Sequence, residues 1–200
     1  MLHLYSTLRS PYGRIVRIVV EEKGLINKIN FTEVTTRGDK NPFYKINPSG
    51  RVPVLILPNG VIIEDSKLIA WYLDNLEGKP TLHKNLEIKR LEAIARSMLD
   101  GTSLWWREYL YRTDQERSDT IIRHERARAL RLADVFENQV EKPVLSGDIN
   151  IAQIVLACVL HGRDHANPED FPWREGRPKL SAWVNKIGLR TSILKTIPPK

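Results

Sequence analysis

The sequence of 200 residues contains a single cysteine, Cys158. One cysteine excludes an internal disulfide framework and is typical of proteins that fold in a reducing compartment. No apolar run approaches the roughly 20 residues that a membrane-spanning helix needs. The first residues, Met-Leu-His-Leu-Tyr-Ser, show no charged segment followed by an apolar one, so no secretory signal peptide is expected. We therefore expect a cytoplasmic protein with no membrane partner.

Long runs of charge of one sign are also missing. The sequence has 31 Lys and Arg residues against 24 Asp and Glu residues, which gives a formal net charge of +7. The two signs are interleaved, and the densest basic cluster, Arg123–Arg131, has the pattern of a solvated helix face. No nucleic-acid-binding motif accompanies this cluster, so we predict no nucleic-acid partner. An apolar content of 42% is ordinary for a globular protein.

The first 78 residues alternate between strand and helix patterns. Short strands are predicted at Leu2–Tyr5 and Ile29–Val34, on either side of a helix that Ser10 caps and Pro11 begins. A hairpin follows around Pro58-Asn59-Gly60, because Asn-Gly tolerates the positive φ that a tight turn needs. This order predicts a small α+β sheet with helices packed against it.

The stretch around the hairpin has a pattern that is compatible with a binding site. Pro53 stands at the mouth of the first hairpin strand, where it cannot donate to a ladder, and we predict a cis bond that leaves the backbone of Val52 available. Asp65 or Ser66 can cap the helix that follows. A strand edge beside a helix N-terminus suits a peptide-like anion. A capped helix with a solvated edge would give the same pattern, and this stretch alone does not separate the two.

The pattern becomes entirely helical in the second part of the chain. Residues 150–153 (Asn-Ile-Ala-Gln) form a capping-box pattern that opens the helix Ile151–Leu160. This helix is apolar nearly all round, which predicts a central place in its domain. We predict an α+β domain over residues 1–78, a linker over residues 79–85 and an all-α domain over residues 86–200.

Several short motifs recur along the chain in a specific order. They are Ser10-Pro11-Tyr12, Asn47–Leu55, Asp65-Ser66 before Ile69–Leu73, Asp100-Gly101, Gly147-Asp148 and Arg177-Pro178. Their order and spacing resemble the cytosolic glutathione transferases, in particular the serine-type members of bacteria and plants. The chain departs from the family at Asp65, where glutamate is commoner, and at Gln153, where the capping box usually ends in aspartate. The resemblance implies a thioredoxin-like N-terminal domain, an all-α C-terminal domain and a homodimer.

The resemblance further implies glutathione as co-substrate, with Ser10 as the catalytic residue. A free thiol is mostly protonated near neutral pH, so the protein must stabilise the thiolate. A hydroxyl at a helix N-terminus can do so, because hydrogen bonds to the charged form lower the pKa of the thiol. Capping the helix is a compatible role for the same side chain. Neither Ser10 nor Gly13 is cysteine, which excludes dithiol redox chemistry and single-thiol glutaredoxin chemistry at Ser10.

The remaining contacts to glutathione are also implied by the resemblance. They involve Lys40, Arg51, Val52, Asp65 and Ser66, with Pro53 as the cis-proline. The backbone of Val52 would bind the cysteinyl unit, and Asp65 and Ser66 would bind the γ-glutamyl end. Arg51 and Lys40 would bind the glycyl carboxylate, although each basic residue alone could be a solvated surface charge. Asp100 either reaches across a dimer interface or lies on a helix surface.

The second substrate is expected between the domains, in an apolar pocket lined by Tyr12, Trp105, Trp106 and Tyr109. Such a pocket suits a small hydrophobic electrophile, as in detoxification. Trp105 and Trp106 are adjacent, so a helix cannot bury both on one stripe, and one of them is expected in the core. Conjugation is the leading function. A non-catalytic interaction module and a glutathione-dependent peroxidase are the alternatives.

Two further patterns are expected to be structural. His161, Asp164 and His165 are spaced to share a helix face and could imitate metal ligands. They stand where the apolar helix runs out and no third histidine is near, so we predict no metal site. Cys158 lies inside that apolar helix and is expected to be a core residue.

Overall fold

The computed structural model describes residues 1–76, 79–163 and 171–199. The chain forms two compact units, described separately below. The first, called the N-terminal unit, comprises Met1–His83 and Thr191–Lys200, and the second, called the helical unit, comprises Lys84–Arg190. The sequence-based division assigned residues 191–200 to the helical domain, whereas the structure groups them with the N-terminal unit.

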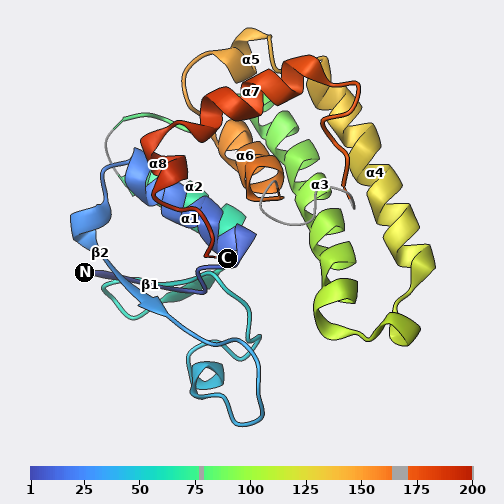
Figure 1. The fold of residues 1–200 in the computed structure, drawn as a ribbon. Coiled ribbons are helices and arrows are strands. Elements are labelled where there is room, and N and C mark those ends of the chain that lie inside the picture. The colour runs from blue at the N-terminus through green and yellow to red at the C-terminus, as the bar shows by residue number, and fades with distance from the viewer. Residues whose placement is uncertain (77–78, 164–170, 200) are drawn as a thin grey trace. The chain divides into compact units, whose positions relative to one another are not determined.

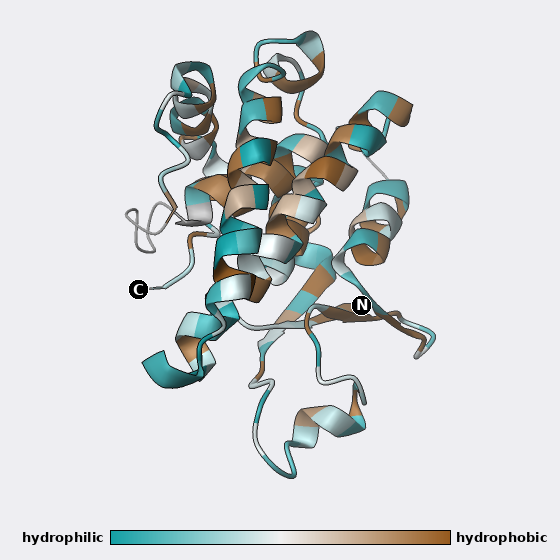
Figure 2. Cartoon of the chain, turned by 90° about the vertical axis from the view of Figure 1, so that its right-hand side faces the viewer, coloured by the Kyte–Doolittle hydropathy of each residue, from teal (hydrophilic) through white to brown (hydrophobic). Residues whose placement is uncertain are grey.

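The N-terminal unit is built on a four-stranded sheet of order β2-β1-β3-β4. Its strands are β1 (Leu2–Ser6), β2 (Ile29–Glu33), β3 (Val54–Ile56) and β4 (Ile62–Glu64). β2 pairs with β1 in parallel, and the other pairs are antiparallel. The strand–helix–strand order and the hairpin are as predicted, and the fold class is confirmed. Figure 2 shows hydrophobic residues along the sheet and mainly polar residues along the loop that follows β2.

Helices complete this unit. They are α1 (Pro11–Glu22), the short η1 (Ile26–Lys28) and η2 (Pro42–Lys45), α2 (Ser66–Leu76) and α8 (Thr191–Leu194). The apolar face of α1 buries Ile15, Val16, Ile18, Val19 and Val20. Full burial of such side chains contributes about 1.5–3 kcal/mol each, so this face is a main source of the unit's stability. Gly24, with φ of +65°, follows the end of the helix.

The C-terminal segment is tied to α1 by polar contacts. Arg14 is completely buried, and its Nη2 donates to the carbonyl of Ile193 (3.2 Å). Its Nε lies 3.5 Å from the hydroxyl of Thr196. The hydroxyl of Ser192 donates to Glu22 Oε1 (2.5 Å). These partners are far apart in sequence, which is why helical periodicity alone assigned the segment to the other domain.

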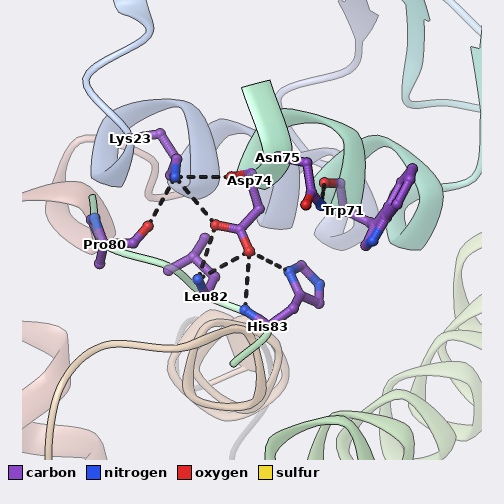
Figure 3. A network of polar contacts seen from close by, with 7 residues as sticks. All are labelled: Lys23, Trp71, Asp74, Asn75, Pro80, Leu82 and His83. Atoms are coloured by element: carbon purple, nitrogen blue, oxygen red, sulfur yellow. Dashed lines mark hydrogen bonds and ion pairs between the residues drawn. The ribbon is translucent and has the colours of Figure 1, made fainter. Parts of the chain in front are cut away.

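A buried ionic network fixes the connection that leaves α2 (Figure 3). Lys23 Nζ donates to the carbonyls of Asp74 (3.0 Å) and Pro80 (2.9 Å) and lies 3.3 Å from Asp74 Oδ1. The Asp74 carboxylate accepts from the backbone N–H groups of Leu82 and His83 and contacts His83 Nδ1 at 2.9 Å. Burial raises the pKa of Asp74, but the hydrogen bonds from Leu82 and His83 outweigh it and hold the pKa below its usual value.

The helical unit packs around one apolar helix. Its helices are α3 (Leu86–Tyr111), η3 (Asp114–Glu116), α4 (Asp119–Glu137), α5 (Pro143–Ser146), α6 (Ile151–Arg163) and α7 (Pro178–Gly188). Every residue of α6 from Ile151 to Leu160 is buried, and α3 and α7 pack against it (Figure 1). Cys158 is 3% exposed, as expected for a core residue. Within the described ranges, no helix combines the length and the apolar character that crossing a membrane requires.

The start of α6 carries the predicted capping box. Asn150 Oδ1 accepts from the backbone N–H of Gln153 (3.2 Å), and Gln153 Oε1 accepts from the backbone N–H of Asn150 (2.8 Å). Gln153 Nε2 also donates to the carbonyl of Leu145 in α5 (2.8 Å), which accepts from Trp183 Nε1 as well. The box therefore satisfies the first turn of α6 and joins it to α5 and α7.

Candidate functional site

The sheet register brings the predicted glutathione-binding segments to one end of the sheet. Tyr5 pairs with Val54, and Val54 pairs with Glu64. The carboxyl ends of β1 and β4 therefore lie beside the amino end of β3. The chain leaves β1 towards Ser10, leaves β4 into Asp65, and enters β3 from Val52.

Ser10 lies at the N-terminus of α1 as its cap. The Ser10 hydroxyl accepts from the backbone N–H of Gly13 (3.1 Å), and the Ser10 carbonyl accepts from the N–H of Arg14 (2.8 Å). A Cβ at Gly13 would lie 1.9 Å from the hydroxyl oxygen of Ser6, so β1 and the first turn of α1 approach closely. The bond from Gly13 uses a lone pair and leaves the hydroxyl hydrogen of Ser10 able to donate. A partly exposed donor at a helix N-terminus is suited to an anion.

The segment before β3 presents backbone groups at the same end of the sheet. The Val52–Pro53 peptide bond is cis. The β1–β3 register ends at the Tyr5–Val54 pair, so Val52 lies beyond the last paired residue and is partly exposed. This position allows its N–H and C=O to pair with an extended ligand in the manner of an added strand.

Asp65 and Ser66 stand where β4 meets α2. Asp65 adopts a positive φ of 77° and accepts from the backbone N–H of Lys67 (2.6 Å), so it caps the helix. Ser66 is the first residue of α2 and is 3% exposed. The exposed Asp65 carboxylate could bind a ligand ammonium group, and the helix N-terminus could bind a carboxylate.

The two predicted basic residues lie on exposed loop positions of the same unit. Lys40 precedes η2 and has a positive φ of 59°. Arg51 directly precedes Val52, and its backbone is held by the side chains of Asn47 and Ser49. Both charged groups are exposed, which is compatible either with binding a ligand carboxylate or with simple solvation.

Sequence reasoning missed the residue that holds this loop. Glu64, the last residue of β4, accepts hydrogen bonds from Asn47 Nδ2 (2.5 Å) and Ser49 Oγ (2.6 Å). The pattern that could have suggested it is a carboxylate placed at a strand end, opposite a segment rich in Asn, Ser and Gly. The hydrogen bonds in the folded chain show that these residues meet.

The predicted aromatic residues differ in exposure. Trp105 is 4% exposed and packs edge-on against Phe171, with ring centroids 5.5 Å apart, so it is the core member of the adjacent tryptophans. Trp106 and Tyr109 are partly exposed, and their ring centroids lie 6.3 Å apart with the ring planes tilted by 45°. The guanidinium of Arg117 lies 4.7 Å from the Tyr109 ring centre. In the N-terminal unit, Tyr12 is partly exposed in the first turn of α1.

Of the three residues that could imitate metal ligands, Asp164 and His165 lie outside the described residues. His161 is described on α6, and its ring occupies the space that a Cβ at Gly188 would fill. Among the residues that the structure describes, no group of three or more His, Cys, Asp or Glu side chains could hold a metal ion. Asp100 is exposed on α3.

Comparison with known proteins identifies both parts of the chain. Residues 9–76 match the N-terminal domain model of the glutathione S-transferases, and residues 115–186 match the C-terminal domain model. The chain is 29% identical over 205 residues to YibF of Escherichia coli, an uncharacterized glutathione S-transferase-like protein, and the match covers 100% of both chains.

Solved structures give the same result. A glutathione transferase family member from Pseudomonas fluorescens with bound glutathione has a TM-score of 0.90 and 29% identity, and the match covers 100% of both chains. A glutathione S-transferase from Methylobacillus flagellatus with glutathione bound has a TM-score of 0.85 and 25% identity, again over 100% of both chains. On these matches and on its fold, the chain belongs to the glutathione transferase family.

Proposed function

We propose that this protein is a glutathione transferase that binds glutathione as its thiolate and transfers it to a small hydrophobic electrophile. The observation that carries the proposal is the position of Ser10, whose hydroxyl stands at the N-terminus of α1 at the sheet end that also presents Val52 and Asp65. Family membership and the glutathione-bound relatives support the choice of ligand.

In the proposed reaction the thiol of bound glutathione loses its proton to solvent. The hydroxyl of Ser10 and the positive end of α1 stabilise the thiolate that remains. The sulfur then attacks the electrophilic carbon of the second substrate. A carbon–sulfur bond forms, and the leaving group departs with the electron pair of the bond that breaks, or the electrons move onto the acceptor if the substrate is an activated alkene.

The rest of the tripeptide is proposed to follow the sheet end. The backbone of Val52, beside Pro53, pairs with the cysteinyl unit. Asp65 binds the ammonium group and Ser66 the α-carboxylate of the γ-glutamyl end. The glycyl carboxylate is bound by the loop cations, which are Lys40 and Arg51. Charge-assisted hydrogen bonds of this kind fix the orientation of a charged peptide as well as its affinity.

The second substrate is proposed to contact aromatic side chains. Trp106 and Tyr109 form a partly exposed pair on α3, and such rings suit a flat or aliphatic electrophile. Tyr12 is proposed as a further contact because it follows Ser10 by two positions. Trp105 lies in the core and packs against Phe171.

We further propose a cytoplasmic homodimer. The lone cysteine suits a reducing compartment. The long helix α3 exposes large side chains, with Leu104, Leu110 and Tyr111 at 42%, 51% and 55% exposure. Sedimentation at micromolar concentration should show twice the 23.1 kDa chain mass, and a monomer alone would contradict the dimer. A monomer would also remove any role of Asp100 across an interface.

Retention on immobilised glutathione followed by activity assays tests the function. The retained protein should conjugate glutathione to at least one of several electrophile classes, and Ser10→Ala should elute as a folded protein of low activity. Retention without conjugation of any electrophile would favour an interaction module. Peroxide reduction without conjugation would favour a glutathione-dependent peroxidase.

A further inference from the structure

A cluster of polar side chains lies directly beside the proposed glutathione contacts. One oxygen of Glu64, Oε2, accepts both from Asn47 Nδ2 (2.5 Å) and from Ser49 Oγ (2.6 Å). The same two side chains then hold the backbone of Arg51. Asn47 Nδ2 donates to the Arg51 carbonyl (3.0 Å), and Ser49 Oγ accepts from the Arg51 N–H (3.2 Å). Both backbone polar groups of the residue before Val52 are therefore fixed through Glu64.

The segment that Glu64 holds has little regular structure of its own. Residues 48–53 lie between η2 and β3 and belong to neither a helix nor a strand. A turn bond from Gly50 N–H to the Asn47 carbonyl (2.9 Å) bends it, and Gly50 has φ of +65°. A Cβ at Gly50 would lie 2.8 Å from the ring of Tyr44. This bend reverses the chain locally, but it does not fix the orientation of the Arg51 backbone. That orientation depends on the side-chain hydrogen bonds.

Glu64 also occupies a particular place in the sheet. It ends β4, pairs with Val54 and is followed at once by Asp65. One residue thus stands between the segment proposed to bind the cysteinyl and glycyl units and the segment proposed to bind the γ-glutamyl unit. Its two hydrogen bonds are short, at 2.5 Å to Asn47 and 2.6 Å to Ser49.

We infer that Glu64 is a positioning residue for glutathione, and this inference rests on the proposed function. Glu64 does not touch the ligand. It acts through Asn47 and Ser49 to hold the Arg51–Val52 backbone in the orientation that pairs with the peptide part of glutathione. Without its carboxylate the segment samples other orientations, and binding then has to include the entropy cost of ordering it.

The hydrogen-bond acceptor of Glu64, rather than its charge, is what this role requires. A negative charge near the site for the glycyl carboxylate opposes an anionic ligand, so charge alone would weaken binding. The amide oxygen of glutamine can accept the same two hydrogen bonds without the charge. Glu64→Gln should therefore keep the loop in place, whereas Glu64→Ala should release it.

Calorimetric titration with glutathione tests the inference on the full chain. Glu64→Ala should raise the Kd about 5- to 10-fold, which corresponds to about 1–1.4 kcal/mol. Glu64→Gln should stay within about threefold of wild type, which is less than about 0.7 kcal/mol. The control is Glu87→Ala, because Glu87 is also an exposed carboxylate with two hydrogen bonds, to Arg90, but lies on α3. It should bind glutathione like wild type.

Two further measurements separate positioning from a general loss of structure. Amide hydrogen exchange in the absence of ligand should speed up at Ser49 and Arg51 in Glu64→Ala and remain unchanged in β1 and α1. With glutathione varied, the KM of Glu64→Ala should rise while kcat at saturation stays near wild type.

The failure of this inference is distinguishable from the failure of the proposed function. A wild-type chain that does not bind glutathione overturns both. If wild type binds and Glu64→Ala binds equally well, the inference alone is wrong. Equal losses in Glu64→Ala and Glu64→Gln would also overturn it, because the acceptor would then not be what matters.

Discussion

The two units fix their connecting segments with different polar groups. In the N-terminal unit the Asp74 carboxylate, paired with Lys23, binds the backbone of Leu82 and His83. In the helical unit a neutral amide has the corresponding role, because Gln153 binds the backbone of Asn150 and Leu145. Both side chains are buried, so each saves backbone groups from being left unsatisfied.

Asp74 and Gln153 are called the ionic anchor and the neutral anchor below. They should differ in how much stability is lost when each is substituted. Removing one member of a buried ion pair leaves an uncompensated charge, whereas removing a neutral amide leaves only unsatisfied hydrogen-bonding groups. The ionic anchor should therefore be the more sensitive of the two, both to mutation and to pH. The following predictions test this contrast and extend it to the chemistry of each unit.

The largest effect on stability is expected for Asp74→Ala. The substitution removes the carboxylate that compensates the charge of Lys23, whose side chain is 0% exposed, and it also removes the acceptor of two backbone N–H groups. Breaking a buried pair in this way costs about 3–5 kcal/mol of unfolding free energy. Urea unfolding followed by circular dichroism measures it. The neighbouring Asn75→Ala, whose exposed side chain donates to the Trp71 carbonyl (Figure 3), should cost much less. Equal losses would contradict the account.

Gln153→Ala should have the next largest effect. It removes the acceptor of the Asn150 N–H and the donor to the Leu145 carbonyl, but Trp183 still bonds that carbonyl. A buried unsatisfied donor costs about 1–3 kcal/mol. The same unfolding experiment should place Gln153→Ala between wild type and Asp74→Ala. A larger loss than that of Asp74→Ala would reverse the proposed order of the two anchors.

Of the two anchors, Asp74 and Gln153, acid should weaken only Asp74. The pKa of Asp74 is lowered in the folded chain, so its ionised form contributes stability at and above the unfolded pKa of about 3.9. That contribution is lost as the pH falls through the lower folded pKa. Between pH 5 and pH 2, wild type should lose more unfolding free energy than Asp74→Asn. Gln153→Ala should keep the wild-type acid dependence. Identical pH curves for wild type and Asp74→Asn would contradict the cause assigned to the shift.

The smallest effect is expected for the aromatic pair of the helical unit. Trp106→Ala should raise the KM for the electrophile about 3- to 10-fold, as expected for one stacking contact of about 0.5–1.5 kcal/mol. The Kd for glutathione should not change. Steady-state kinetics with each substrate varied in turn separates the two. A loss of glutathione affinity instead would mean that Trp106 acts on glutathione binding.

Local patterns predicted much of the fold. Ser10 before Pro11, Asn59-Gly60 between apolar runs and the Asn150–Gln153 box each depend on neighbours a few residues away, and each forms as predicted. The contacts of Arg14 with residues 193 and 196 could not be predicted, because their partners are distant in sequence. The role of Glu64 was missed for the same reason.

Part of the candidate site could also be predicted from the sequence, and part could not. Ser10, Val52 and Asp65 follow from cap and strand-end chemistry, and the sheet register brings their segments to one end. The identity of the electrophile cannot be predicted from the aromatic residues, because rings such as Trp106 bind many apolar groups. Sequence alone could state that Trp105 and Trp106 differ in burial, but it could not state which one is in the core.

The central claim is that Ser10 holds glutathione as a thiolate, and a pH titration of the bound thiol tests it most directly. Thiolate absorbance is recorded against pH with glutathione saturating wild type and Ser10→Ala. In wild type the apparent pKa of the bound thiol should lie well below the free value of about 8.5. In Ser10→Ala it should move back towards that value while the protein still binds glutathione. A wild-type pKa equal to that of the free thiol, or an unchanged pKa in Ser10→Ala, would contradict the account.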